Sequence, residues 1–222
     1  MTGWWRPGLL IAGRDLVIDR RTGEALLVTA PFGAVALWLT PMAVGTDLPL
    51  LRQVGPGMFW VVVLLFGSLV ALRNSTLETP AQAGMMTLAG VPAAVRMLGM
   101  VAASFVLLVV FELVLLPVAV ALFDPPWKSV GWMFVMVPVV AAGLALLGTV
   151  AHGLLHSGAQ RLTLGPLLTV PLSVPLLLGA TQTSEAVALG RSPVPWLLLA
   201  LVVDLVLVLA LLFTGRVLDG AS

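Results

Sequence analysis

The chain has 222 residues, of which 60% are hydrophobic and only 9% are charged, and it contains no cysteine. About a quarter of the residues in a soluble domain are charged, so this composition excludes a water-soluble globular protein. The net charge of +1 provides no basic surface for binding nucleic acid. The lack of cysteine excludes disulfides and cysteine-bound zinc or iron–sulfur centres.

Six stretches are long and apolar enough to cross a bilayer, which takes about 20 residues of helix. Only two charged side chains lie within them, Glu112 and Asp204. The connecting segments are too short to fold as separate domains. The sequence therefore predicts an all-α integral membrane protein with one transmembrane domain over residues 1–222. Its six transmembrane helices are expected at residues 25–44, 54–72, 97–122, 132–151, 164–180 and 196–213.

The basic residues predict the orientation in the membrane, because arginine and lysine concentrate in cytoplasmic loops. An even number of spans puts both termini on one side, and that side has eight basic residues against three on the other. We therefore expect a multi-pass protein of the inner membrane with both termini in the cytoplasm. The eight are Arg6, Arg14, Arg20, Arg21, Arg73, Arg96, Arg161 and Arg216, and the three are Arg52, Lys128 and Arg191.

Residues 1–24 lack the apolar run of a cleavable signal peptide. Trp5, Leu9, Ala12 and Leu16 recur instead at the spacing of one helix face. This pattern predicts an interfacial helix that lies on the cytoplasmic surface of the bilayer.

Glu112 and Asp204 are the most informative polar residues. A carboxylate at the middle of a bilayer costs about 2.5–3.5 kcal/mol and usually faces the interior of a helix bundle or a wet cavity. Two interpretations stay open for each residue: it lines a transport path, or it fixes the packing of neighbouring helices. Pro171 and Pro175 are further candidates, because broken helical hydrogen bonds are tolerated in lipid only where protein or a cavity satisfies the freed carbonyls. The fifth span is therefore expected to face other helices.

His152 and His156 are four residues apart and would share a helix face at the cytoplasmic end of the fourth span. This spacing suits the binding of a metal ion or a haem iron. A zinc peptidase, however, has a glutamate as general base directly after the first histidine, and this chain has Gly153 there. We expect polar residues at a helix end, with a haem contact as the weaker alternative and no metal site. No catalytic residue is predicted, because the sequence offers no constellation of nucleophile, acid and base.

ATP hydrolysis by this chain is not expected. A phosphate-binding loop needs the pattern G-x-x-x-x-G-K-[ST], whereas the single lysine, Lys128, follows Trp127. Any ATP-driven step would therefore depend on a separate subunit.

Pro56, Gly57 and Trp60 open the second span in the pattern P-G-x-x-W-V. Together with the stretch from Arg14 to Arg20 and the run Pro171–Leu177, they resemble the haem exporter protein B family, CcmB, over nearly the whole chain. The resemblance implies an ABC-2-type permease, a subunit without enzymatic activity that serves haem transport in cytochrome c maturation. It also implies haem as the cargo, no cofactor held by this chain, and ATP on a partner subunit.

The same resemblance implies two partners, an ABC ATPase subunit and a haem-handling membrane subunit. The cytoplasmic segment between the second and third spans would dock on the ATPase, with Glu78, Met85, Met86 and Leu88 as candidate contacts. It lacks the acidic stretch usual in the family, so the docking charges are expected to differ. The alternative is an ordinary polar connection. Two copies of the chain are expected to pair, because six helices with so few polar groups barely enclose a polar path.

Two other functions stay open at this point. One is an ABC-2-type permease for another lipophilic cargo. The other is a membrane anchor that transports nothing and couples ATP hydrolysis to the release of a haem carrier.

Overall fold

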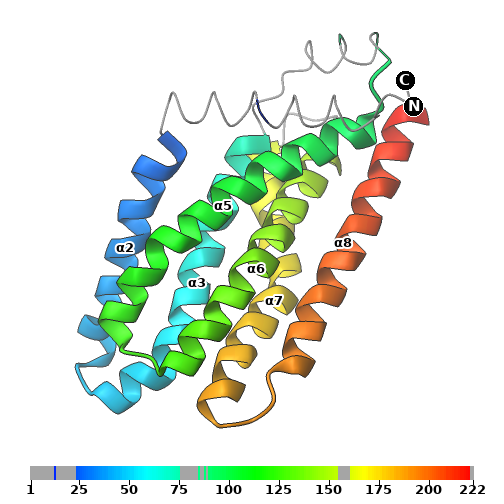
Figure 1. The fold of residues 1–222 in the computed structure, drawn as a ribbon. Helices are drawn as coiled ribbons and strands as arrows, with labels where there is room; N and C mark the ends of the chain where they lie inside the picture. The colour runs from blue at the N-terminus through cyan, green and yellow to red at the C-terminus, as the bar shows by residue number, and fades with distance from the viewer. Residues whose placement is uncertain are drawn as a thin grey trace.

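The computed structural model describes residues 24–75, 90–154 and 161–220, together with Gly13, Met85 and Leu88. These residues form a bundle of six long helices, and no strand occurs among them (Figure 1). The expected all-α fold is therefore confirmed. The interfacial helix predicted at residues 1–24 lies outside the described residues, apart from Gly13 and Glu24. The helices are α2 (Glu24–Val44), α3 (Leu48–Ser75), α5 (Ala93–Phe123), α6 (Trp127–Leu154), α7 (Arg161–Ala188) and α8 (Val194–Gly220).

Each expected span lies within one of these helices, but two helices extend well beyond the apolar stretch. Helix α3 begins at Leu48 instead of residue 54, and α7 continues to Ala188 instead of residue 180. Hydropathy marks the part of a helix that suits lipid, whereas backbone hydrogen bonding continues through polar residues.

The polar end of α7 shows how a helix continues beyond its apolar stretch. The hydroxyl groups of Thr181, Thr183 and Ser184 each donate a hydrogen bond to the carbonyl oxygen four residues earlier, at 2.9, 2.7 and 3.2 Å. Serine and threonine can satisfy themselves inside a helix in this way. The chain therefore stays helical although its side chains become polar.

Five helices contain a stretch long and apolar enough to cross a membrane. Helix α7 packs among them, against α3, α6 and α8. The described residues are therefore those of a multi-pass helical bundle. The five stretches are Leu26–Val44, Leu48–Ala71, Ala93–Phe123, Trp127–Gly153 and Val194–Val217.

The helices run side by side, and α6 is at the centre of the bundle (Figure 1). It packs against α3, α5, α7 and α8, and 72% of its membrane-length stretch is buried, compared with 17% for α2. The turns at residues 45–47, 124–126 and 189–193 lie at one end, which we call the short-turn end. Helix α2 begins and α8 ends at the opposite end.

Small residues allow the helices to approach closely. A Cβ atom added to Gly148 of α6 would lie 2.9 Å from the Cβ atom of Ala71 on α3. A Cβ atom added to Gly215 of α8 would lie 2.9 Å from the Cα atom of Ala94 on α5. Such contacts are typical of membrane bundles, where lipid is as apolar as the protein interior and association depends on close packing.

We expect Gly148→Ala to destabilise the protein by about 1–3 kcal/mol, the usual cost of overpacking a tight contact. Gly131→Ala is the matched control on the same helix, because no atom lies within 4 Å of its Cβ position. Thermal unfolding of the purified proteins in detergent measures the difference. Equal melting temperatures for the two variants would show that α3 and α6 are not held at this distance.

Candidate functional site

The residues of the P-G-x-x-W-V pattern join α3 to α7 near the short-turn end. The indole nitrogen Nε1 of Trp60 donates a hydrogen bond to Oγ of Ser184 on α7 at 3.2 Å, and both side chains are buried. A Cβ atom added to Gly57 would lie 4.0 Å from Cγ2 of Thr181, one turn away on α7. Pro56, which precedes Gly57 on α3, is also buried. The pattern therefore builds a helix junction.

Two neighbouring residues join α3 to the end of α5. A Cβ atom added to Gly55 would lie 2.3 Å from Cγ of Phe123, so α3 packs directly on that ring. Arg52 donates from Nε to the backbone oxygen of Asp124 at 2.9 Å and forms an ion pair with the carboxylate of Asp124. Asp124 ends α5 in a left-handed conformation with φ 42°.

The sequence offered no signal for the pairing of Arg52 with Asp124. From the sequence, Arg52 is only one of the basic residues that predict the orientation of the chain in the membrane. Because both side chains are largely exposed, their ion pair contributes only about 0.2–1 kcal/mol. Its main effect is to fix where α3 meets the end of α5.

Glu112 lies in the middle of α5 and is completely buried. Leu108 and Leu115, one turn to either side on the same face, belong to the main buried core. Neither carboxyl oxygen of Glu112 has a hydrogen-bond partner among the described residues. A buried polar group without a hydrogen-bond partner costs free energy.

Asp204 of α8 is half-buried and lies where three helices meet. A Cβ atom added to Gly143 of α6 would lie 2.6 Å from Oδ1 of Asp204 and 2.5 Å from Cδ2 of Leu176 on α7. The absence of a side chain at Gly143 therefore makes the space that the carboxyl group occupies. Oδ1 is buried and has no hydrogen-bond partner in the described part of the chain. Gly143 was not among the residues singled out from the sequence.

The two carboxyl groups occupy separate places, one on α5 and one at the junction of α6, α7 and α8. Within the described ranges, no hydrogen bond or ion pair joins them, and no group of three or more potential metal ligands occurs. Pro171 and Pro175 lie on the exposed face of α7, whereas Ser173 and Leu176 between and beside them are buried. The prolines therefore do not line the helix contacts within one chain.

Of the remaining predicted residues, the structure describes His152, Met85 and Leu88. His152 is buried in the last turn of α6, and the adjacent Gly153 packs against Met97 and Thr214. Met85 and Leu88 are helical and highly exposed. Their proposed neighbours Glu78 and Met86 lie outside the described residues, as does His156.

Helices of membrane-spanning length, with carboxyl groups buried between them, define a multi-pass integral membrane protein. The family described as CcmB protein matches residues 8–216. The chain therefore belongs to the CcmB family, and the resemblance noted in the sequence is confirmed.

Three relatives named "Heme exporter protein B" support this assignment. The protein from Pseudomonas aeruginosa is 30% identical over 189 residues, which cover 79% of this chain and 80% of the relative. The protein from Haemophilus influenzae is 28% identical over 186 residues, with 82% and 83% covered. The protein from Bradyrhizobium diazoefficiens is 27% identical over 182 residues, with 80% of each chain covered.

We expect Trp60→Phe to lower the free energy of unfolding by more than the about 0.5–1.5 kcal/mol of the lost hydrogen bond to Ser184, because the smaller ring also leaves a cavity. A double-mutant cycle with Ser184→Ala measures the interaction, and the two effects should not add. Trp38→Phe is the control, since Trp38 is exposed on α2. Additive effects of the two substitutions would contradict a bond between α3 and α7.

Proposed function

We propose that this chain is the membrane subunit of an ABC transporter complex that delivers haem for cytochrome c maturation. The observation that carries this proposal is the match of the CcmB family to residues 8–216, together with the name heme exporter protein B of its relatives. The bundle of apolar helices supports a role within the membrane.

In this proposal, the energy comes from a separate ATPase subunit. The single lysine of the chain lies at the start of α6, in a sequence without a phosphate-binding loop. Met85 and Leu88 supply exposed apolar side chains three residues apart, the spacing of a helix that docks in a groove. We place the ATPase contact there, at the cytoplasmic end of the bundle.

The short-turn end then faces the outside of the inner membrane, with both termini in the cytoplasm. Arg52, Lys128 and Arg191 are the basic residues of the short-turn end, and the larger number predicted for the other end supports this orientation.

Further subunits complete the proposed complex. A haem-handling membrane subunit accompanies this chain, and two copies of the chain pair. The membrane-length stretches of α2 and α8 are only 17% and 28% buried within one chain, which leaves apolar surface for such contacts. Haem is the cargo in this proposal, and no cofactor belongs to the chain itself.

Glu112 and Asp204 are assigned to the transport cycle instead of to static packing. Both have buried carboxyl oxygens without hydrogen-bond partners in the described ranges, an arrangement that costs free energy in the present conformation. A second conformation, or the cargo itself, would supply those partners. Ionisable residues within membrane helices often mark transport pathways.

Purified complex in lipid vesicles tests this function. A haem-binding protein enclosed in the vesicles detects haem that enters in an ATP-dependent way. The rate of entry should fall at least tenfold in Glu112→Ala and in Asp204→Ala. A tenfold fall is expected when a group that stabilises the transition state by about 1.4 kcal/mol is lost. Glu185→Ala is the control, since this exposed carboxylate bonds to Gln182 at the end of α7.

Three outcomes separate the alternatives. Full haem delivery by correctly folded Glu112→Ala and Asp204→Ala variants would show that both side chains serve only the packing of helices. ATP-dependent delivery of another lipophilic compound but not haem would change the cargo. Haem-carrier release without transport in the wild type would favour a membrane anchor.

The docking contact has its own test. Met85→Asp combined with Leu88→Asp should release the ATPase subunit during purification. In the proposed contact both side chains are buried against the ATPase, and burying a charge there is costly. Leu189→Asp is the control, since Leu189 is exposed in the turn after α7 at the short-turn end. Undiminished copurification of the ATPase would rule out these anchors.

A further inference from the structure

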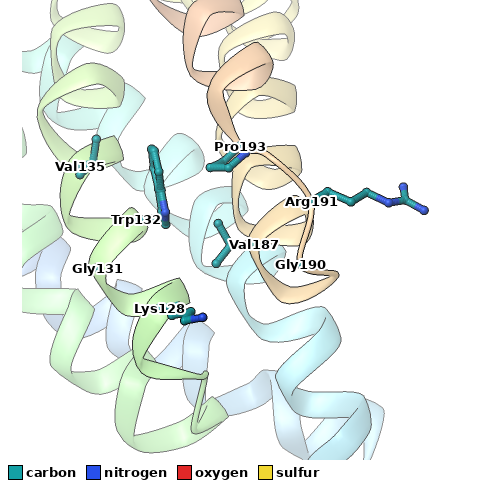
Figure 2. Close-up of a pocket in the computed structure, with 8 residues that line it drawn as sticks. All are labelled: Lys128, Gly131, Trp132, Val135, Val187, Gly190, Arg191 and Pro193. Atoms are coloured by element: carbon teal, nitrogen blue, oxygen red, sulfur yellow. The ribbon is translucent and has the colours of Figure 1, made fainter.

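A cavity of about 390 Å³ opens at the short-turn end between the start of α6 and the turn from α7 to α8 (Figure 2). It is separate from Glu112, from Asp204 and from the P-G-x-x-W-V junction. Residues from both sides line it: Lys128, Gly131, Trp132, Val135, Val187, Gly190, Arg191 and Pro193.

Two glycines leave the cavity open. No atom lies within 4 Å of the Cβ position of Gly131 on α6 or of Gly190 in the turn. Gly190 also has a φ of +67°, a conformation that other residues rarely adopt. The space beside both glycines is therefore open.

The lining changes from charged to apolar along α6. Lys128 lies in the first turn and is exposed, Trp132 follows one turn later, and Val135 comes next. Val187 and Pro193 form the facing wall (Figure 2). A membrane phospholipid has the same order of chemistry, with a charged headgroup at the surface, an interfacial zone and then acyl chains. Indole rings also settle at the membrane interface.

The charge at the cavity is positive. Lys128 lines the cavity at the start of α6, and Arg191 extends outward from the rim (Figure 2). None of the residues that line the cavity is acidic. At the same end of the bundle, Asp124 already pairs with Arg52, and Glu185 accepts a hydrogen bond from Gln182. Asp47 lies in the turn between α2 and α3 and does not line the cavity. The positive charges thus remain available for an anionic group.

We propose that this cavity binds the headgroup of an anionic phospholipid, with the phosphate at Lys128 and the acyl chains along Trp132 and Val135. The ammonium group attracts the phosphate, and Arg191 adds a second cation at the rim. This site would fix α6, the central helix, against the turn between α7 and α8 through a lipid. The proposal goes beyond haem delivery and needs only that the short-turn end lies at a membrane surface.

Native mass spectrometry of the detergent-purified full-length complex tests the site. Phosphatidylglycerol and phosphatidylcholine with identical acyl chains are added in equal amounts, and the bound ratio is measured. Lys128→Gln should lower the preference for phosphatidylglycerol about fivefold, the contribution of one basic residue near a membrane surface. Arg191→Gln should lower it less, because its guanidinium points away from the cavity.

Arg52→Gln is the matched control. It removes the same charge at the same end of the bundle, but Arg52 is engaged by Asp124 and does not line the cavity. Its lipid preference should equal that of the wild type. An equal loss in Arg52→Gln and Lys128→Gln would show a general charge effect and overturn the site.

Further outcomes identify the ligand. An unchanged preference in Lys128→Gln, with folding verified by thermal unfolding, would overturn the proposal. Haem propionates are also anionic, so titration with haem tests whether the cavity binds haem or the phospholipid. Weaker haem binding in Lys128→Gln with an unchanged lipid ratio would assign the cavity to haem and overturn the lipid site. Unchanged haem binding with a reduced lipid ratio supports the lipid, independently of whether the complex transports haem.

Discussion

The rest of the structure depends on one constraint, the need of every backbone amide in lipid to find its hydrogen-bond partner within the protein. Helices meet this constraint locally, so each apolar stretch becomes a complete helix. They continue into polar residues where side chains such as Thr181 and Thr183 bond to their own helix. What holds the helices together is then close packing, because lipid competes equally for apolar side chains. Gly148 against Ala71 and Gly215 against Ala94 show how closely the backbones approach.

Polar side chains serve two different purposes in this bundle. Trp60 and Ser184 satisfy each other between α3 and α7, while Arg52 caps the end of α5 through Asp124. These pairs fix the relative positions of helices. Glu112 and Asp204 are different, because their buried oxygens lack partners among the described residues. The present arrangement of helices therefore satisfies the first group of polar side chains but not the buried oxygens of Glu112 and Asp204.

One of the stretches that carry the family resemblance lies in the helix contacts. Pro56, Gly57 and Trp60 lie where α3 meets α7, and Gly55 lies where it meets α5. This pattern is part of the resemblance to the family. It reveals nothing about the cargo, which the proposed function takes from the relatives' name. The residues that we propose for the transport cycle lie elsewhere, on α5 and α8, and Met85 and Leu88 are the proposed ATPase contacts.

The sequence by itself determined the helical fold, the position of the apolar stretches and the membership of the family. It also singled out Glu112 and Asp204, because a charge within an apolar run is visible along the chain. Only the tertiary structure decided their surroundings: the space that Gly143 leaves for Asp204, the partner of Trp60 on α7, and the cavity beside Lys128. Hydropathy is a local property, whereas these contacts depend on how each helix is rotated about its axis. In lipid both faces of a helix are apolar, so the sequence pattern does not mark which face points inward.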